Sequence, residues 1–402
     1  MPEHARGLSA GMTLLLAATA GISVANLYLA QPMIGLIGPS VGLHPGAYGL
    51  VVTLTQMGYA AGLLLLVPLG DFLENRRLMV VTLCCSAAAL LFTAQAHAPG
   101  AFLLACFVVG LSSVTPQMAV PMAAHLAAPE KRGRQVATVV SGLLTGILFG
   151  RPIASLIASV AGWRAVFVAA TLAMLVMALV LRLQLPSRHP RTRGHYGSML
   201  ISLWTLALRT PILRQRTAYH MGLFFAFSVF WTTIPLELAR HFGFGQRGIA
   251  IFSLVGAAGA FSAPIAGRLA DRGLIRRGTL GSMAMVAVGI ALTWPAALLQ
   301  GWSSMILFVI ASVLLDGGVQ AHLTFAQKIL FDLAPEIRSR INAIFIAGAF
   351  VAAAVGSAVA PLIYHLSGWP LAAALGLIPP VLALGAYLRQ GDAGRLAAAP
   401  SH

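Results

Sequence analysis

Apolar stretches long enough to cross a lipid bilayer recur from one end of this 402-residue chain to the other. A membrane-spanning helix needs about 20 predominantly apolar residues. The N-terminal stretches are Ala10–Ile37, Tyr48–Leu69, Leu78–Ala96, Ala101–Leu126, Val136–Ala161 and Ala165–Leu183. The C-terminal stretches are Thr217–Leu238, Ile249–Ala266, Thr279–Leu299, Ser303–Ala326, Ile341–Leu366 and Leu371–Leu388. Because backbone polar groups must be satisfied internally in lipid, we expect an all-α integral membrane protein with about twelve transmembrane helices.

The composition excludes a soluble globular domain. Hydrophobic residues make up 58% of the chain, charged residues make up only 9%, and the mean hydropathy is +0.87. The stretch beginning at Ala10 is long enough to span and lacks a convincing cleavage site, so it is interpreted as the first membrane helix. Cys84, Cys85 and Cys106 lie in apolar stretches without ligand spacing, and no metal site or disulfide is expected.

The net charge of +16 has a topological explanation. Basic residues of membrane proteins concentrate in cytoplasmic loops. When the 26 Lys and Arg residues are assigned to alternate sides, only Arg164, Arg240 and Arg247 fall on the minority side, and Arg151 falls inside an apolar stretch. We therefore expect both termini and the central linker to be cytoplasmic, and no nucleic-acid partner is needed to explain the charge.

The two halves of the chain repeat each other, at an offset of 206 residues in one series and 200 residues in another. One repeated series is Pro129, Glu130, Arg132, Arg134, Gly142, Gly150, Gly162 and Trp163, which matches Pro335, Glu336, Arg338, Arg340, Gly348, Gly356, Gly368 and Trp369. Another is Leu69, Asp71, Arg76 and Arg77, which matches Leu269, Asp271, Arg276 and Arg277. The expected organisation is a six-helix bundle at 1–185, a cytoplasmic linker at 186–216, a second six-helix bundle at 217–390 and a cytoplasmic tail at 391–402.

Three motifs carry a resemblance to a known family. A loop signature of glycine, aspartate and basic residues is formed by Gly267, Asp271, Arg272, Arg276 and Arg277. The first apolar stretch carries Asn26, Tyr28, Gln31 and Pro32, and the tenth carries Asp316, Gly318 and Gln320. In these residues the chain resembles the major facilitator superfamily, and within it the branch of bacterial drug-proton antiporter-like permeases. The first copy of the loop signature keeps Asp71, Arg76 and Arg77 but has Val67 and Phe72 at two signature positions.

The resemblance implies a central substrate cavity between two pseudo-symmetric bundles. The candidate cavity residues are polar or aromatic and lie on the spans that line the cavity in that superfamily: Asn26, Tyr28, Gln31, Gln117, Phe224, Phe227, Trp231, Gln320 and His322. Few polar groups among aromatic rings suit an amphipathic organic solute. The alternative for any one of these residues is ordinary packing or a hydrogen bond between helices.

Two charged residues fall inside apolar stretches. A charge at the bilayer centre is costly, so Asp316 should face a cavity or a partner, and we assign it as the candidate proton carrier. A structural hydrogen-bonded carboxylate is the alternative. Arg151 invites pairing with Asp316, but it could instead satisfy backbone carbonyls near Pro152 or bind an anion.

Other motifs have a conformational interpretation. The loop residues proposed as a cytoplasmic gate are Asp71, Arg76, Arg77, Gly267, Asp271 and Arg272, whose charges and helix dipoles can hold the two bundles together. Gly142, Gly146 and Gly150 share one helix face and favour close helix packing. Glu237 lies near the external end of its span, as an outer gate or simply as an interfacial residue.

The sequence favours a secondary active transporter, with proton-coupled efflux of a small organic or drug-like compound as the leading interpretation. A proton symporter or facilitator that imports a sugar or other small metabolite is the alternative. The chain lacks a phosphate-binding loop that ends in lysine, and it lacks the HExxH and GxSxG arrangements, so neither an ATP-driven pump nor an enzyme is expected. The expected protein is a cofactor-free monomer in the inner (plasma) membrane, with small-molecule substrate, protons and lipid as its partners.

Overall fold

A computed structural model describes residues 8–190, 195–333 and 337–389. Within these ranges the regular structure consists of α-helices and short 3-10 helices, without a strand. The expected all-α fold is confirmed. Arg191, Arg193, Pro335, Glu336 and the tail at 391–402, which entered the sequence interpretation, lie outside the described residues.

The helices of the first half follow the predicted stretches closely. They are α1 (Ala10–Ala25), η1 (Gln31–Met33), α2 (Ile34–Ser40), η2 (Pro45–Ala47), α3 (Gly49–Leu65), η3 (Val67–Asp71), α4 (Asn75–Gln95), α5 (Pro99–Ser112), α6 (Thr115–Leu126), α7 (Arg132–Ala161) and α8 (Trp163–Gln184). The first predicted span is broken into α1, η1 and α2. Pro32 lies at this break, where a residue without a backbone N–H cannot continue an α-helical ladder.

The second half has the same alternation of long and broken helices. Its elements are α9 (Tyr196–Arg209), α10 (Pro211–Phe242), α11 (Gln246–Gly256), η4 (Ala257–Phe261), α12 (Ser262–Asp271), α13 (Ile275–Leu298), α14 (Gly301–Leu333) and α15 (Arg338–Arg389). The last two predicted stretches merge in α15, where Gly368 has a φ of 73° and divides the helix. Nine helices among the described residues are long and apolar enough to cross a membrane. The count of twelve stays a prediction.

The expected linker contains a helix that the sequence interpretation did not anticipate. α9 occupies Tyr196–Arg209, and α10 already begins at Pro211. The Tyr196 hydroxyl donates a 2.6 Å hydrogen bond to the Leu65 carbonyl at the end of α3. α9 also leaves Trp204 68% exposed. An amphipathic helix with exposed apolar side chains beside a membrane span is typical of a segment that lies in the interface.

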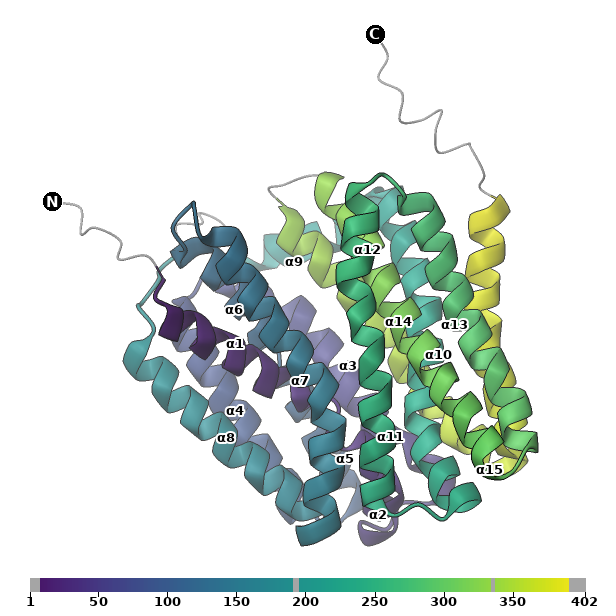
Figure 1. Ribbon diagram of the computed structural model, residues 1–402. Coiled ribbons are helices and arrows are strands. Elements are labelled where there is room, and N and C mark those ends of the chain that lie inside the picture. The colour runs from purple at the N-terminus through teal and green to yellow at the C-terminus, as the bar shows by residue number, and fades with distance from the viewer. Residues whose placement is uncertain (1–7, 191–194, 334–336, 390–402) are drawn as a thin grey trace, which may run out of the picture.

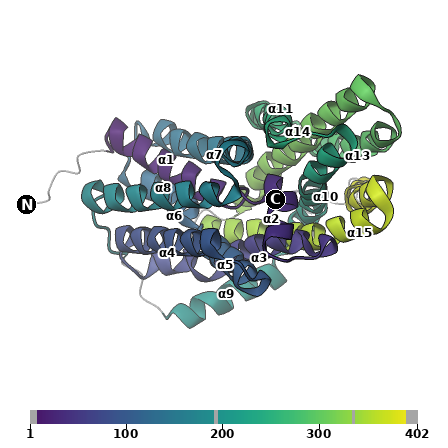
Figure 2. The same cartoon turned by 90° about the horizontal axis from the view of Figure 1, so that it is seen from below.

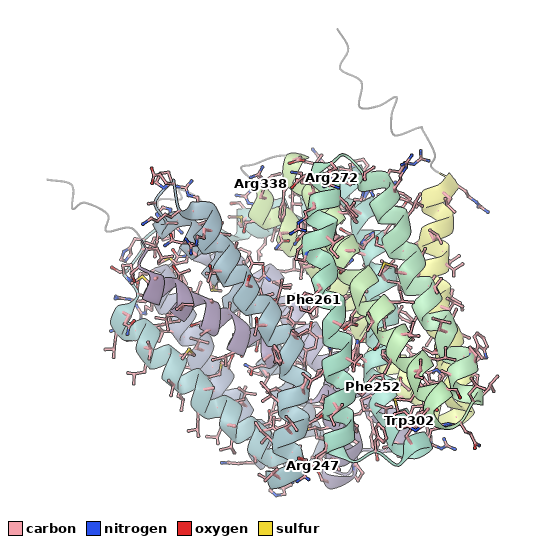
Figure 3. The ribbon with its side chains drawn as sticks, viewed as in Figure 1. Arg247, Phe252, Phe261, Arg272, Trp302 and Arg338 are labelled. Atoms are coloured by element: carbon pink, nitrogen blue, oxygen red, sulfur yellow. The ribbon has the colours of Figure 1, made fainter. Side chains whose placement is uncertain are left out.

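The helices form two bundles that meet along a central seam (Figures 1 and 2). α1 and α4–α8 lie in one bundle and α10–α15 in the other. The most extensive packing of helices across the seam is α3 against α15 and α7 against α11. Arg272 and Arg338 lie at one face, hereafter the basic face, and Arg247 and Trp302 lie at the other, hereafter the opposite face (Figure 3).

Gly146 illustrates how tightly the helices of one bundle approach each other. A Cβ atom at Gly146 would overlap the carbonyl oxygen of Gly21 on α1. We expect Gly146→Ala to lower the free energy of unfolding by about 1–3 kcal/mol, because backbone atoms cannot yield as a flexible side chain can. Gly133→Ala on the same helix is the matched control, since its Cβ would meet no atom within 4 Å. Thermal unfolding in detergent would measure both, and equal stability of the two variants would contradict the packing explanation.

Candidate central cavity

A charged centre joins the two halves at the seam. Arg151 of α7 is 5% exposed, and its guanidinium lies 4.4 Å from the centre of the Trp231 ring on α10. The Trp231 indole N–H donates a 2.7 Å hydrogen bond to Asp316 Oδ1 on α14. Trp231 therefore connects a cation of the first half with a carboxylate of the second half. Arg151 and Asp316 themselves make no ion pair within 4.0 Å.

Arg151 is held mainly by aromatic rings and one amide. Its Nε donates a 2.8 Å hydrogen bond to Gln31 Oε1, and the same Gln31 donates through Nε2 to Thr232 Oγ1 across the seam. The rings of Tyr28 and Phe227 lie 4.7 and 5.1 Å from the guanidinium carbon. Aromatic faces stabilise a desolvated guanidinium through cation–π attraction. Its Nη2 is buried without a hydrogen-bond partner among the described residues.

Two glycines of the second half bring the backbone close to Asp316. A Cβ at Gly259 in η4 would lie 2.5 Å from Asp316 Cβ, and one at Gly256 would lie 3.2 Å from Asp316 Oδ2. The 3-10 segment η4 interrupts the helix at this level. A side chain at either position would displace the carboxylate, so the local sequence keeps this site open for Asp316.

A cavity of about 730 Å³ extends from this centre toward the basic face. Arg151 and Asp316 line its deep part, and Phe331 and Arg338 line its part near the start of α15. Most of its wall is apolar or aromatic, with contributions from both halves. A cavity of this size and character suits a small organic molecule.

The structure places most predicted site residues at or next to this cavity. Those that line it are Tyr28, Gln117, Phe224, Phe227, Gln320, Arg151 and Asp316. Gln31 and Trp231 lie behind the lining and bond to Arg151 or Asp316. Asn26 is directed elsewhere, since its amide contacts the sulfur of Met174 on α8 at 3.5 Å. His322 is fully buried and does not line the cavity.

Sequence reasoning missed His220, the partner of His322. Nδ1 of His220 and Nδ1 of His322 lie 3.2 Å apart with nearly parallel rings, so one imidazole donates to the other. His220 lines the cavity, while Nε2 of His322 is buried without a partner among the described residues. A signal was present, because His220, Phe224 and Phe227 recur at helical spacing along one face of α10.

Closer to the basic face, the predicted residue Gln117 belongs to a polar network whose other members were not predicted as site residues. Gln117 donates to the Tyr59 hydroxyl at 3.2 Å, and Asn342 of α15 donates to Gln117 Oε1 at 3.3 Å. Gln327 then donates to Asn342 Oδ1 at 2.9 Å. These amides cross the seam, and a shared hydrogen-bonded network of this kind can only be recognised once the two halves are placed together.

Polar contacts close the seam on the side of the opposite face. Gln56 of α3 exchanges hydrogen bonds with Ser228 at 3.4 Å and accepts one from Ser357 at 3.3 Å. Thr53 donates to the Ala354 carbonyl at 3.1 Å. The cavity therefore reaches toward the basic face while these contacts between α3, α10 and α15 seal the other end.

The sequence profile described as Major Facilitator Superfamily matches residues 16–325. The chain belongs to the major facilitator superfamily. It is similar to "Uncharacterized transporter YgaY" of Escherichia coli O157:H7, with 37% identity over 92% of each chain. It is also similar to "Chloramphenicol resistance protein" of Streptomyces lividans, with 27% identity over 68% of this chain and 69% of that protein. The crystal structure of a mutant of the nucleoside transporter NupG shares the fold, with a TM-score of 0.74, 13% identity, and coverage of 94% of this chain and 100% of that one.

The proposed gate residues of this superfamily member lie at the basic face and pair mostly within their own halves. Asp271 contacts Lys328 of α14 at 3.5 Å, and both side chains are exposed. Arg76 contacts Glu74 at 3.4 Å and donates to the Leu185 carbonyl at 3.1 Å.

Asp71 is a gate residue that interacts electrostatically with a charged residue of the other half. Arg340 of α15 attracts its carboxylate, as does Arg188 of the linker. Arg77 is exposed, and a Cβ at Gly267 would meet no atom within 4 Å. The assignment of these residues as a gate stays a prediction.

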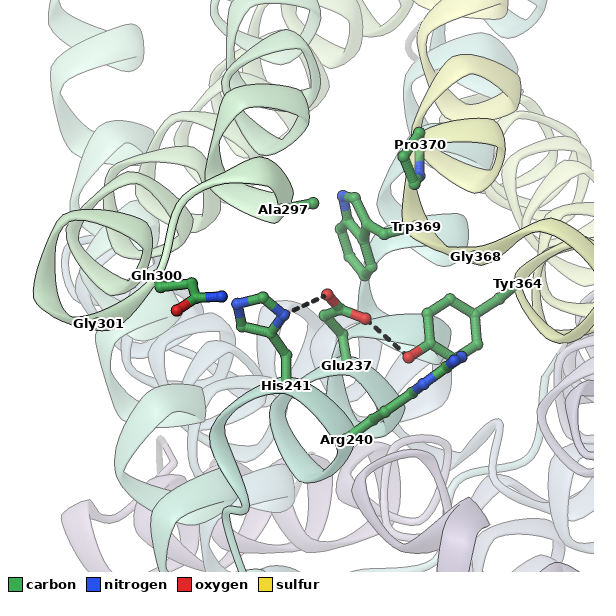
Figure 4. A pocket seen from close by; sticks show the side chains of 10 residues that line it. All are labelled: Glu237, Arg240, His241, Ala297, Gln300, Gly301, Tyr364, Gly368, Trp369 and Pro370. Carbon is green, nitrogen blue, oxygen red and sulfur yellow. Dashed lines mark hydrogen bonds and ion pairs between the residues drawn. The ribbon is translucent and has the colours of Figure 1, made fainter.

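Glu237 lies in a separate pocket of about 600 Å³ at the opposite face, lined only by residues of the second half (Figure 4). It is 6% exposed, accepts a 2.7 Å hydrogen bond from the Tyr364 hydroxyl, and lies 3.8 Å from His241 Nδ1. Because α10 and α15 both belong to one half, this contact fixes the interior of that half. It does not cross the seam, as an outer gate between the halves would.

Tyr364→Phe should therefore destabilise the second half. The variant removes a hydrogen bond to a buried charged group, and we expect a loss of about 1.5–3 kcal/mol in unfolding free energy. Tyr48→Phe is the matched control, since the Tyr48 hydroxyl makes no hydrogen bond within the described ranges. Thermal unfolding in detergent is the measurement. A loss of stability no larger than that of the control would show that the hydrogen bond between Tyr364 and Glu237 does not stabilise the second half.

Proposed function

We propose that this chain is a proton-coupled secondary transporter of a small organic solute that works by alternating access. The observation that carries the proposal is the half-buried carboxylate of Asp316 and the buried guanidinium of Arg151, which lie on opposite halves around Trp231. Ionisable groups inside membrane proteins are costly and are typically kept for function. Asp316 serves as the proton site, and the adjoining cavity holds the solute.

Protonation of Asp316 changes the force between the halves. With Asp316 ionised, its negative charge attracts Arg151 across the seam, in an environment where charges are weakly screened. With Asp316 protonated, this attraction is lost and the bundles separate more easily. The rocking units are 1–185 and 217–390, and 186–216 connects them without forming part of the transport path.

Two directions of coupling have support. Exchange of a solute for protons, and hence efflux, was the leading interpretation from the sequence, and the name of the Streptomyces lividans resistance protein supports it. Cotransport of solute and proton is the second candidate. The permanently cationic Arg151 beside the proton site favours cotransport, because it disfavours a second cation at that site.

The orientation in the membrane is part of the proposal. The excess of Lys and Arg at the basic face supports a cytoplasmic position for that face in the inner membrane. The proposed transporter acts as a monomer. In this proposed orientation, the cavity extends toward the cytoplasm.

Proton movement in proteoliposomes tests the proposal. The purified protein would be challenged with a panel of amphipathic cations, aryl carboxylates, sugars and amino acids while the internal pH is recorded. We expect at least one class of solute to drive proton movement, and its sign distinguishes exchange from cotransport. Saturable solute flux without any proton movement would instead identify a facilitator and overturn the proton-coupled function.

A further inference from the structure

We infer that the substrate of the central cavity is an organic anion with an aromatic or apolar body, whose charged group binds Arg151. The inference deepens the proposed function, on which it rests only in taking Asp316 as the proton site. It is carried by the hydrogen bonds of the guanidinium, by the charges of the cavity lining and by the rings around them.

The guanidinium of Arg151 has unused hydrogen-bonding capacity. A guanidinium carries five N–H donors in a planar fork that matches a carboxylate. Within the described ranges, its one hydrogen bond runs from Nε to Gln31, and Nη2 is buried without a partner. It also lies over the faces of Tyr28, Phe227 and Trp231. Buried donors without partners cost free energy that an anionic ligand recovers.

The other charges of the cavity agree with this assignment. Among the lining residues that the structure describes, Asp316 is the single acidic side chain, and Arg338 adds a second positive charge near the basic face. Arg338 donates through Nε to the Phe331 carbonyl at 2.7 Å, which fixes it near the cavity mouth. A cavity with this balance of charge attracts anions and repels cations.

The total charge of Arg151, Asp316 and the bound ligand also distinguishes between the possible substrates. Without ligand, Arg151 and an ionised Asp316 leave the centre neutral. A bound monoanion together with a proton on Asp316 leaves it neutral again. A bound cation beside ionised Asp316, or an empty site with Asp316 protonated, leaves one positive charge in a weakly polar cavity, which is unfavourable. Electrostatics therefore favour an anion that moves together with a proton.

The groups that face Asp316 support this proton balance. Arg151 approaches it from α7, Tyr28 from the segment between α1 and η1, and Trp231 from α10. The adjoining η4 consists of alanine, glycine and phenylalanine and brings no titratable group. Arg151 thus supplies the positive charge beside Asp316 that an anion would neutralise.

The side chains of the cavity wall indicate what the uncharged part of the ligand is like. Phe224 and Phe227 stack with nearly parallel rings at 5.1 Å, and Phe350 meets Phe224 edge to face at 5.2 Å. Farther toward the basic face, Gln117 and Gln320 supply amides. An aryl carboxylate presents its charged group to Arg151 and its ring to these phenylalanines.

Equilibrium binding to the purified protein in detergent tests the substrate class. The probes are matched in shape and differ in charge: benzoate, benzamide and benzylammonium, and then naphthoate, naphthamide and naphthylmethylammonium. We expect a carboxylate to bind the wild type about tenfold or more tighter than its amide and its ammonium analogue. Arg151→Gln should remove this preference, whereas Arg151→Lys should retain part of it because the charge remains.

Arg164→Gln is the matched control for the arginine substitution. Arg164 lies at the start of α8, where it packs on Trp163 away from the cavity, and its loss should leave the carboxylate preference unchanged.

A second readout needs no Arg151 variant. Naphthoate added to the wild type in weak buffer should cause proton uptake, and Asp316→Asn should bind naphthoate without it.

The outcomes distinguish the inference from the proposed function. Absence of any carboxylate preference in the wild type, or a preference that survives Arg151→Gln in a folded protein, overturns the anion site whatever the proton measurements give. A carboxylate preference that depends on Arg151 but brings no proton uptake supports the anion site and counts against proton coupling. Proton release on binding an ammonium probe would establish exchange with a cation and overturn the inference.

Discussion

Asp316→Asn is expected to reduce solute-driven proton movement to the level of vesicles without protein. Asparagine keeps the size of the side chain, and its amide oxygen can still accept the hydrogen bond from Trp231. It cannot exchange a proton, so the loaded and empty transporter would carry the same number of protons. Exchange of labelled for unlabelled solute across the membrane needs no net proton transfer and should persist in the variant.

Asp332→Asn provides the matched control for this prediction. Asp332 is on the same helix, α14, but it is exposed near the basic face. We expect its replacement to leave proton movement close to that of the wild type. Proton movement that survives in Asp316→Asn at the wild-type rate would show that another group carries the proton.

Gly49→Leu is expected to shift the transporter toward a conformation open at the opposite face. A Cβ at Gly49 would overlap the carbonyl oxygen of Ser357 on α15 and would lie 3.0 Å from Pro361. This contact crosses the seam and exists only while the opposite face is closed. Overpacking costs about 1–3 kcal/mol, and each 1.4 kcal/mol is tenfold in population, so the open conformation should gain about fivefold to a hundredfold.

The shift can be measured as a distance between paramagnetic labels at the opposite face. Cysteines in place of Arg164 and Trp302 would place one label on each half in a background without the native cysteines. We expect the distance distribution to lengthen in Gly49→Leu and the transport rate to fall. Gly100→Leu is the control, because a Cβ there meets no atom within 4 Å. An unchanged distance in Gly49→Leu would mean that the Gly49 contact does not hold the seam closed.

Part of the site was predictable because the membrane imposes strong rules on single residues. Asp316 and Arg151 are conspicuous in apolar stretches, and a charge in lipid must find a cavity or a partner. Both line the central cavity. The direct pair that the sequence suggested between them is absent within 4.0 Å, since Trp231 bonds to one and stacks on the other. No rule of spacing predicts that an indole of α10 takes this place.

The all-α membrane fold follows from the amino-acid sequence alone, because the length of the apolar stretches and the cost of unpaired backbone groups in lipid leave few alternatives. The sequence also indicated superfamily membership through its loop and helix motifs, which the profile match at residues 16–325 confirms. Other features could be recognised only in the folded chain: His322 faces His220 instead of the cavity, Glu237 bonds within one half, and Gln31 joins Arg151 to Thr232. These contacts join residues far apart in the chain, and the packing of whole helices sets which side chains meet.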